Sequence, residues 1–256
     1  MTSFSILELT VAIAVLLAAA GGVFPLMLPS NGVLASQSEA GDMQQRLRIA
    51  ADALARGLVS AGAGPFGAAD GSPFAATVAA IRPYRVGAVR PDPPGTFRRD
   101  TISVLSLPRT AIGSATPQSS TYWQQSDDAA RTYQLMLYDG AGGADVPVVD
   151  HVVSVEFEYW GDPPAGGSPA LVKLTPDILT DGPWMPDDAA ADRWDADLLR
   201  IRRIAVTIRV EAAIASLRGP ASALFAHAGT ATSAHAWAPD IEAHFDVTPR
   251  NLNLAR

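Results

Sequence analysis

Glu8 is the residue in this chain whose type and position most clearly point to chemistry. It is the one charged side chain in the 25-residue apolar stretch from Phe4 to Leu28. An ionised group at mid-bilayer depth costs on the order of 3 kcal/mol, so such residues indicate a function and a partner. A carboxylate in a dry place can accept a charge-assisted hydrogen bond from a cation. The alternative is that Glu8 lies at the headgroup boundary, where this cost falls away.

A second group of acidic residues lies between residues 177 and 197. Its seven aspartates offer oxygen ligands of the kind that calcium takes, roughly six to eight per ion. Their spacing does not fit the calcium-binding loop of an EF-hand, because the central glycine and the final glutamate are misplaced. A solvated loop is therefore the preferred interpretation. If calcium binds there, the expected ligands are Asp187, Asp188 and Asp192.

Other chemical motifs are missing from the sequence. The four histidines are scattered without metal-ligand spacing, and there is no GxSxG elbow, P-loop or GxGxxG fingerprint. The chain has no cysteine, which excludes disulfides, thiolate metal sites and a lipoprotein anchor. These patterns predict a protein that is not an enzyme and needs no cofactor.

The charge balance argues against nucleic acid as a partner. The net charge is −7 over 256 residues, and Lys173 is the single lysine. A nucleic-acid-binding protein would be expected to carry a basic face.

Two helical segments would position Glu8. Roughly 20 apolar residues span a hydrocarbon core of about 30 Å, so residues 4–28 are long enough to cross a membrane. The segment from Pro29 to Gly32 predicts a local break in the helix. Residues 29–64, which begin with this break, are predicted to continue the helix as an amphipathic segment. Its apolar stripe ends before Gly62-Ala63-Gly64-Pro65 and contains Met43, Leu47, Ala50 or Ala51, Leu54 and Leu58.

Residues 65–256 are predicted to form a β-rich globular domain. Alternating apolar and polar residues recur in short segments that Gly/Pro-rich connectors separate. No helices recur between these segments, so the sheet is expected to be antiparallel and the fold α+β. The predicted strands are 101–107, 132–138, 151–160, 170–174, 201–210 and 241–247.

The N-terminal segment, Phe4-Ser5-Ile6-Leu7-Glu8-Leu9 and the apolar run after it, resembles the type IV pilin superfamily. The resemblance implies a pilin-like fold, in which a long N-terminal helix packs on an antiparallel sheet. It also implies that a prepilin peptidase removes a leader, here residues 1–3, between Ser3 and Phe4. The family prefers glycine where this chain has Ser3, and this leader has no Lys or Arg.

The resemblance also assigns roles to individual residues. Phe4 would be the N-methylated first residue of the mature chain, and Pro25 would be the proline that bends the helix. Glu8 would accept a charge-assisted hydrogen bond from the free α-amino group of a neighbouring subunit's Phe4. That pairing would set the axial register of subunits in a filament.

Later segments are similar to those of PilW-like minor pilins. They are Gln44 to Leu54, Asp195 to Arg203 and Pro249 to Leu252. The implied function is a minor pilin that primes or caps a type IV pilus, anchored in the bacterial inner membrane with its C-terminal domain in the periplasm. The implied partners are other minor pilins, the major pilin, the prepilin peptidase and the inner-membrane assembly platform.

Three alternatives stay open at this point. The J-type minor pseudopilins of type II secretion share much of the same pattern. A membrane-tethered periplasmic binding protein or enzyme would use the apolar run only as an anchor. A secretory signal cleaved after Val33-Leu34-Ala35 would release a domain that begins at Ser36, although such a signal has a basic start and a shorter apolar run.

Overall fold

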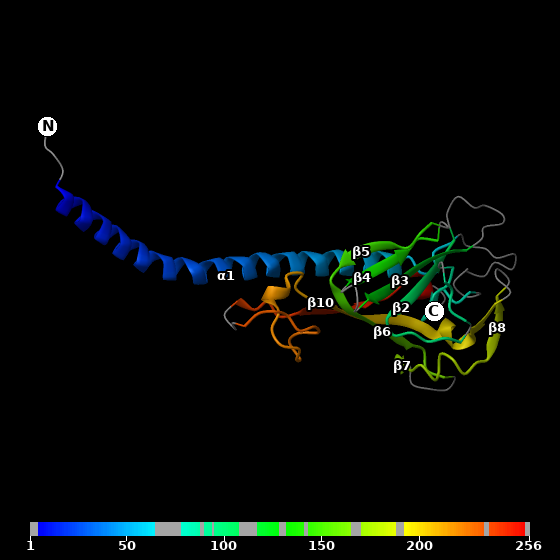
Figure 1. Ribbon diagram of the computed structural model, residues 1–256. Coiled ribbons are helices and arrows are strands. Elements are labelled where there is room, and N and C mark those ends of the chain that lie inside the picture. The colour runs from blue at the N-terminus through cyan, green and yellow to red at the C-terminus, as the bar shows by residue number, and fades with distance from the viewer. Residues whose placement is uncertain are drawn as a thin grey trace. The chain divides into compact units, whose positions relative to one another are not determined.

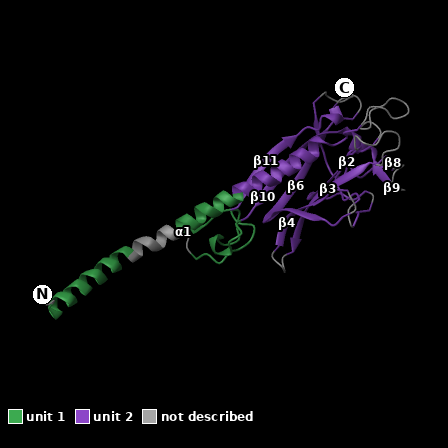
Figure 2. Ribbon diagram, turned by 90° about the horizontal axis from the view of Figure 1, so that it is seen from above, with its two compact units in different colours: residues 1–43, 212–239 green, residues 44–211, 240–256 purple. Residues whose placement is uncertain are grey.

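The structure is a computed structural model that describes residues 5–64, 78–87, 90–93, 95–107, 117–127, 132–140, 143–164, 170–187, 192–232 and 236–253. At residues 24–31, 187 and 192 it describes the backbone alone. The chain divides into two compact units (Figure 2). Unit 1 consists of Met1–Met43 and Ala212–Pro239, and unit 2 of Gln44–Glu211 and Asp240–Arg256.

The long helix α1 (Ile6–Val59) contains 54 residues (Figure 1). It begins in unit 1 (Figure 2). Its bounds extend across Pro29 to Gly32, so the local break predicted there does not end the helix. The predicted stop is confirmed: Gly62 has a φ of 69°, in the left-handed region that favours glycine. The Gly62 N–H donates to the carbonyl of Leu105 at 2.9 Å, which ties the end of α1 to unit 2's first sheet.

Unit 2 contains two main antiparallel sheets and a hairpin, and the fold class is therefore α+β as predicted. The first sheet has the strand order β1-β2-β3-β4-β5, the second β11-β10-β6-β7, and β8 pairs with β9. The bounds in the first sheet are β1 (Ile81–Arg82), β2 (Thr101–Ser106), β3 (Gln118–Asp127), β4 (Thr132–Tyr138) and β5 (Val146–Asp150). The others are β6 (Val152–Gly161), β7 (Val172–Leu174), β8 (Trp184–Asp187), β9 (Asp192–Asp195), β10 (Ile201–Val210) and β11 (Ile241–Val247).

All six predicted strands are present, and the 3-10 helices η1 (Ala196–Arg200), η2 (Ala215–Leu217) and η4 (Asn251–Asn253) were not predicted. The chain passes from the first sheet to the second at His151, between β5 and β6. His151 has a φ of 60°, which is uncommon for a residue with a side chain. Its carbonyl accepts the N–H of Glu211 at 3.0 Å, so the crossing point is bonded to the residue that follows β10.

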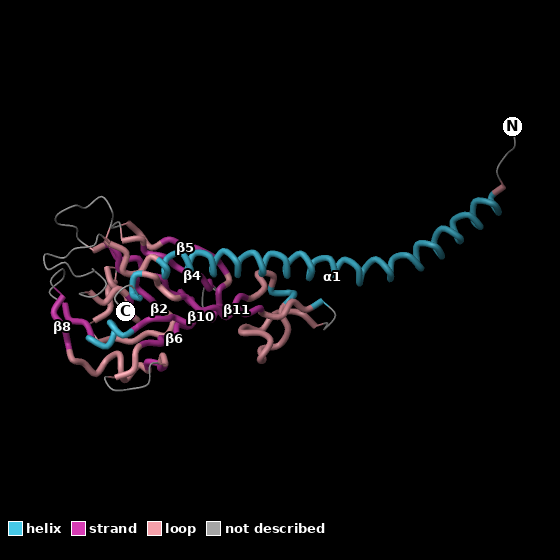
Figure 3. Tube along the Cα trace, turned by 180° about the vertical axis from the view of Figure 1, so that it is seen from behind, coloured by secondary structure: helices cyan, strands magenta, loops and turns pink. Residues whose placement is uncertain are grey.

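The part of α1 that belongs to unit 2, residues 44–59, packs on the strands of that unit (Figure 3). The predicted apolar stripe is confirmed at Met43, Ala50, Leu54 and Leu58, which are completely buried, whereas its fifth member, Leu47, is only half-buried. The hydroxyl of Tyr122 on β3 donates to the carbonyl of Ala53 at 3.3 Å, joining helix and sheet. Complete burial of a leucine contributes about 1.5–3 kcal/mol each, so this stripe fixes the helix on the domain.

Unit 1 contains a folded connection, Ala212–Pro239, between β10 and β11; we call it the collar. A T-shaped contact between Phe225 and Trp237, with ring centroids 5.7 Å apart, forms its centre. The Ala238 N–H donates to the Leu217 carbonyl at 2.8 Å, and the Gly229 N–H to the Gly219 carbonyl at 2.9 Å. The collar is therefore a folded segment with its own internal contacts, and not a short turn that merely joins two antiparallel strands.

Glu39 of α1 holds the collar against the helix. Its side chain is only 3% exposed, and Oε1 accepts the N–H of Ala213 at 2.7 Å. Within the collar, Arg218 donates to the carbonyls of Ala212 and Ala213 in the same backbone segment. A buried charge on the helix and a buried charge on the collar thus both bind this short stretch of backbone.

Replacing Glu39 with alanine should release the collar. The Ala213 N–H would lose a charged acceptor, which costs about 1.5–3 kcal/mol, so local opening should become roughly ten-fold or more frequent. Arg218 is the one Lys or Arg in the collar, so trypsin can cut the collar only there. We expect faster cleavage after Arg218 in Glu39→Ala, measured by mass spectrometry. Asp42→Ala, an exposed change on the same helix, should leave that cleavage rate unchanged.

Candidate assembly site

The start of α1 is fixed by Ser5. The Ser5 hydroxyl oxygen accepts the N–H of Leu7 at 3.3 Å, and its carbonyl accepts the N–H groups of Glu8 and Leu9 at 3.0 and 3.2 Å. Ser5 is thus the N-cap and Glu8 the third helical residue, the Ser-x-x-Glu spacing of a capping box. This capping box was not predicted, although the spacing of Ser5 and Glu8 is visible in the sequence. An acid in the first turn also interacts favourably with the helix dipole.

The N-terminal part of α1 presents apolar side chains to its surroundings. Between Ile6 and Val23 the large apolar residues are from 51% exposed at Ile13 to 83% exposed at Ile6. Among the described residues this is the one helical segment long and apolar enough to cross a membrane. An apolar surface of this extent marks a site that lipid or protein covers.

Glu8 is exposed on this surface. It is the only charged residue between Phe4 and Ser38, a stretch in which every other side chain is uncharged. Within the described part of the chain, no hydrogen bond or ion pair engages its carboxylate. The geometry therefore presents one carboxylate, near the start of a helix, on an otherwise uncharged surface.

The other residues predicted to act in processing and assembly fall outside what the structure describes. Ser3 and Phe4 precede the first described residue, and Pro25 lies within α1 where the backbone alone is described.

The three calcium candidates have no described side chains. Asp187 ends β8, Asp192 begins β9, and Asp188 lies outside the described residues. The structure instead gathers three other aspartates of the same run, Asp181, Asp195 and Asp197, whose carboxylate oxygens lie within 4.8 Å of one another.

Hydrogen bonds within the fold account for this grouping. Oδ1 of Asp195 accepts the N–H of Asp197 at 2.8 Å, and Oδ2 accepts the N–H of Gly182 at 2.7 Å. The carboxylate of Asp197 is paired with Arg200 at 2.8 Å. Asp195 thus caps η1 and fixes the hairpin before it, which is a structural role that requires no metal ion.

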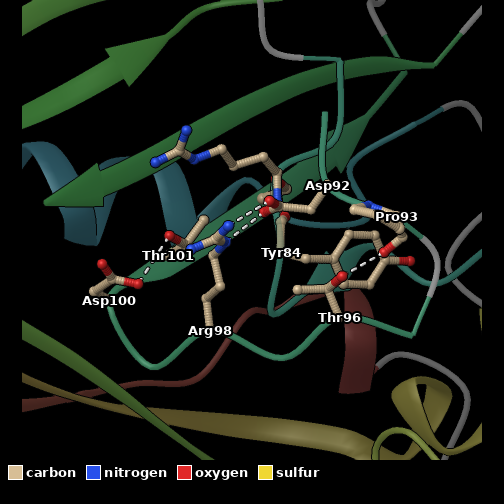
Figure 4. A network of polar contacts seen from close by, with 9 residues as sticks. Tyr84, Asp92, Pro93, Thr96, Arg98, Asp100 and Thr101 are labelled. Carbon is tan, nitrogen blue, oxygen red and sulfur yellow. Dashed lines mark hydrogen bonds and ion pairs between the residues drawn. The ribbon is translucent and has the colours of Figure 1, made fainter. Parts of the chain in front are cut away.

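A second polar network shapes the segment between β1 and β2 (Figure 4). Asp92 binds Arg98 through both carboxylate oxygens, each at 2.8 Å, and also accepts the N–H of Arg85 at 3.0 Å. Burial by itself raises the pKa of Asp92, but these bonds and the two arginine charges outweigh it and lower the pKa below its ordinary value. The same pairing raises the pKa of Arg98.

Asp92→Ala should destabilise the domain by about 1–2 kcal/mol at neutral pH, because Arg98 and the Arg85 N–H lose their acceptor. Because the pKa of Asp92 is lower in the folded chain, this contribution is complete above the carboxylate's unfolded pKa and is lost as pH falls through the folded value. The difference between wild type and variant in urea unfolding should therefore be larger at pH 7 than at pH 3. Asp177→Ala, an exposed carboxylate in a turn, is the control and should change little at either pH.

Two of the open hollows on unit 2 are lined by charged and aromatic side chains. One, of about 280 Å³, lies beside Phe97, Glu158 and Lys173, and the other, of about 430 Å³, beside Arg85, Trp123 and Asp145. Neither is lined by a histidine, so within the described residues neither offers a nucleophile with a histidine base. Lys173 at the first is already paired with Glu158 at 2.6 Å.

Comparison with known proteins gives little further information. No protein-family model matches this sequence, and no curated protein matches it either. Among solved structures, a type IV-like pilin from Thermus thermophilus is similar at 15% identity, over 82% of this chain and 97% of that chain, with a TM-score of 0.36. A similarity of this size is too low to establish a shared fold or function.

Proposed function

We propose that this chain is a pilin-like structural subunit that waits in the bacterial inner membrane and is incorporated into a filament. The observation that carries the proposal is the combination on α1 of an exposed, uncharged helical surface with one carboxylate close to its start. A membrane anchor alone needs the apolar surface but has no need of Glu8. A helix that must also pack against other subunits has a use for both.

In this proposal Glu8 acts by pairing with another subunit. The mature chain begins at Phe4, and Glu8 accepts a charge-assisted hydrogen bond from the α-amino group of a neighbour's Phe4. Both groups lie where water is scarce, so burying either charge without the other costs free energy, and the paired state is favoured. Pro25 bends the helix within the filament core.

More narrowly, we propose a minor pilin that primes or caps a type IV pilus and has no catalytic role. The PilW-like segments at both ends of the chain support this assignment. Its partners are other minor pilins, the major pilin, the prepilin peptidase and the inner-membrane assembly platform. The second candidate is a minor pseudopilin of type II secretion, and deletion distinguishes the two: a minor pilin's loss reduces piliation, whereas a pseudopilin's loss reduces protein export.

The proposal is tested by the mass of the mature chain and by its location. We expect the intact protein from membranes to begin at N-methylated Phe4, and we expect it in filaments sheared from cells. A soluble product that begins at Ser36 would show that the apolar run is a signal sequence. A chain that stays in the membrane and never enters filaments would support the tethered binding protein or enzyme instead.

A further inference from the structure

The collar differs from the rest of the chain in its composition. Arg218 is the only Asp, Glu, Lys or Arg among its 28 residues, whereas 18% of the whole chain is charged. Eleven of the 28 residues are alanine, and most of the others are Gly, Ser, Thr or Pro. The one charge is buried and donates to backbone carbonyls. The described surface of the collar is therefore free of charged groups.

The collar lies on α1 just beyond the membrane-spanning segment. Glu39 accepts the N–H of Ala213 at 2.7 Å, and a Cβ at Gly32 would lie 3.6 Å from the Cβ of Ala236. The contact thus covers about two turns of the helix, from Gly32 to Glu39. The next large apolar side chains on this part of α1, Val33 and Leu34, are 44% and 62% exposed.

The uncharged surface of α1 is longer than a bilayer requires. Leu9 to Ser38 contains no charged residue, and Glu39, the first one after it, is buried where it binds the collar. The first exposed charge is Asp42. At about 1.5 Å per residue the uncharged surface extends for about 50 Å, whereas the hydrocarbon core is about 30 Å thick. A tilt of more than about 50° would be needed to bury it all in lipid, beyond the range of transmembrane helices.

The part of this surface outside the bilayer suits protein better than lipid. It includes Ser36, Gln37 and Ser38, whose side chains hydrogen-bond and are unfavourable in hydrocarbon. The collar has no exposed Lys or Arg that would attract anionic headgroups within its described residues. Small side chains allow helices to approach closely. Two large apolar side chains, Leu224 at 57% and Ile214 at 46% exposed, project from it.

We infer that the collar and the adjoining Val33–Leu34 turn of α1 form a docking surface for the uncharged N-terminal helix of a neighbouring filament subunit. The inference rests on the proposed function, because only staggered subunits bring one chain's first helix beside another chain's collar. The sequence of α1 stays uncharged from Leu9 to this turn, so one neighbouring helix can remain in uncharged contact beyond the span. Burial of Glu39 beneath the collar removes the charge that would otherwise interrupt this contact.

A photo-crosslinking amino acid at Leu224 tests the occupant in cells that assemble filaments. We expect the crosslinked peptide, mapped by mass spectrometry, to come from the first 25 or so residues of a filament subunit (roughly one membrane span). The same photo-crosslinking amino acid at Ala144, an exposed alanine of unit 2, should not capture the N-terminal segment of a neighbouring subunit. Crosslinks from Leu224 only to lipid, or only to the globular part of another protein, would overturn the inference.

Introducing a charged residue on the collar surface tests the inference independently. Leu224→Asp should reduce the chain's abundance in sheared filaments about ten-fold or more relative to membrane levels, while Ala144→Asp should not. Resistance of Arg218 to trypsin shows whether the collar of the variant is still folded. If wild type enters filaments and a folded Leu224→Asp enters equally well, the collar inference fails and the proposed function stands. If wild type itself is absent from filaments, the proposed function fails.

Discussion

Glu8→Ala is expected to remove the chain from filaments while leaving membrane insertion intact. In the proposed pair, the variant would leave a neighbour's α-amino group without its carboxylate, and breaking a buried ion pair from one side costs about 3–5 kcal/mol. We therefore expect the amount in sheared filaments, relative to the amount in membranes, to fall at least ten-fold. Insertion should not suffer, because alanine is more favourable than glutamate in a transmembrane helix.

Glu8→Gln separates this role from helix capping. Ser5 and Glu8 have the capping-box spacing, and glutamine serves that motif as well as glutamate does. If Glu8 only stabilises the start of α1, Glu8→Gln should behave as wild type, and Glu8→Ala should lose no more than about 1 kcal/mol of local helix stability. If Glu8 pairs with a cation, Glu8→Gln should also be depleted from filaments. Normal incorporation of both variants would contradict the assembly role.

Gly161→Ala is expected to cause a large loss of stability in unit 2. A Cβ at this position would lie 2.2 Å from the carbonyl oxygen of Arg200 and 2.7 Å from Cδ1 of Leu174. That carbonyl also accepts the N–H of Asp162 at 2.9 Å, so it cannot move away without loss. We expect the pairing of β6 with β10 to open at this end, at a cost of about 3 kcal/mol or more in the free energy of unfolding.

Gly143→Ala is the matched control. A Cβ at Gly143 would meet nothing within 4 Å, so the same chemical change should alter the free energy of unfolding by no more than about 0.5 kcal/mol. Urea unfolding of both variants, followed by circular dichroism, measures the difference. Equal midpoints for Gly161→Ala and wild type would show that the backbone at Arg200 accommodates the methyl group.

The sequence did not predict strand β3, and its composition explains why. β3 has the sequence Gln-Ser-Ser-Thr-Tyr-Trp-Gln-Gln-Ser-Asp, in which polar residues outnumber apolar ones. It pairs with β2 on one side and β4 on the other, so its neighbours determine that it is a strand. The Gln124 amide donates to the carbonyls of Val152 and Val153, which gives one of these polar side chains a partner on β6.

The sequence predicts only part of the candidate site, because the site depends on more than one chain. The position of Glu8 in an uncharged run is a property of the chain itself, and so is its spacing from Ser5. The partner proposed for Glu8 belongs to another subunit. A sequence can therefore predict that a partner is needed without establishing its geometry.

What the sequence alone determined is what depends on neighbours along the chain. The uncharged helical run, the buried stripe of α1 and the six alternating strands follow from the periods of helix and strand. Only the tertiary structure decided how distant segments meet. It divided the strands between two sheets at His151, paired the carboxylate of Asp195 with backbone N–H groups, and placed the collar on α1. The bond from Ala213 to Glu39 joins residues 174 positions apart. Whether Glu39 is solvated or buried therefore depends on tertiary packing, which the local sequence around Glu39 does not predict.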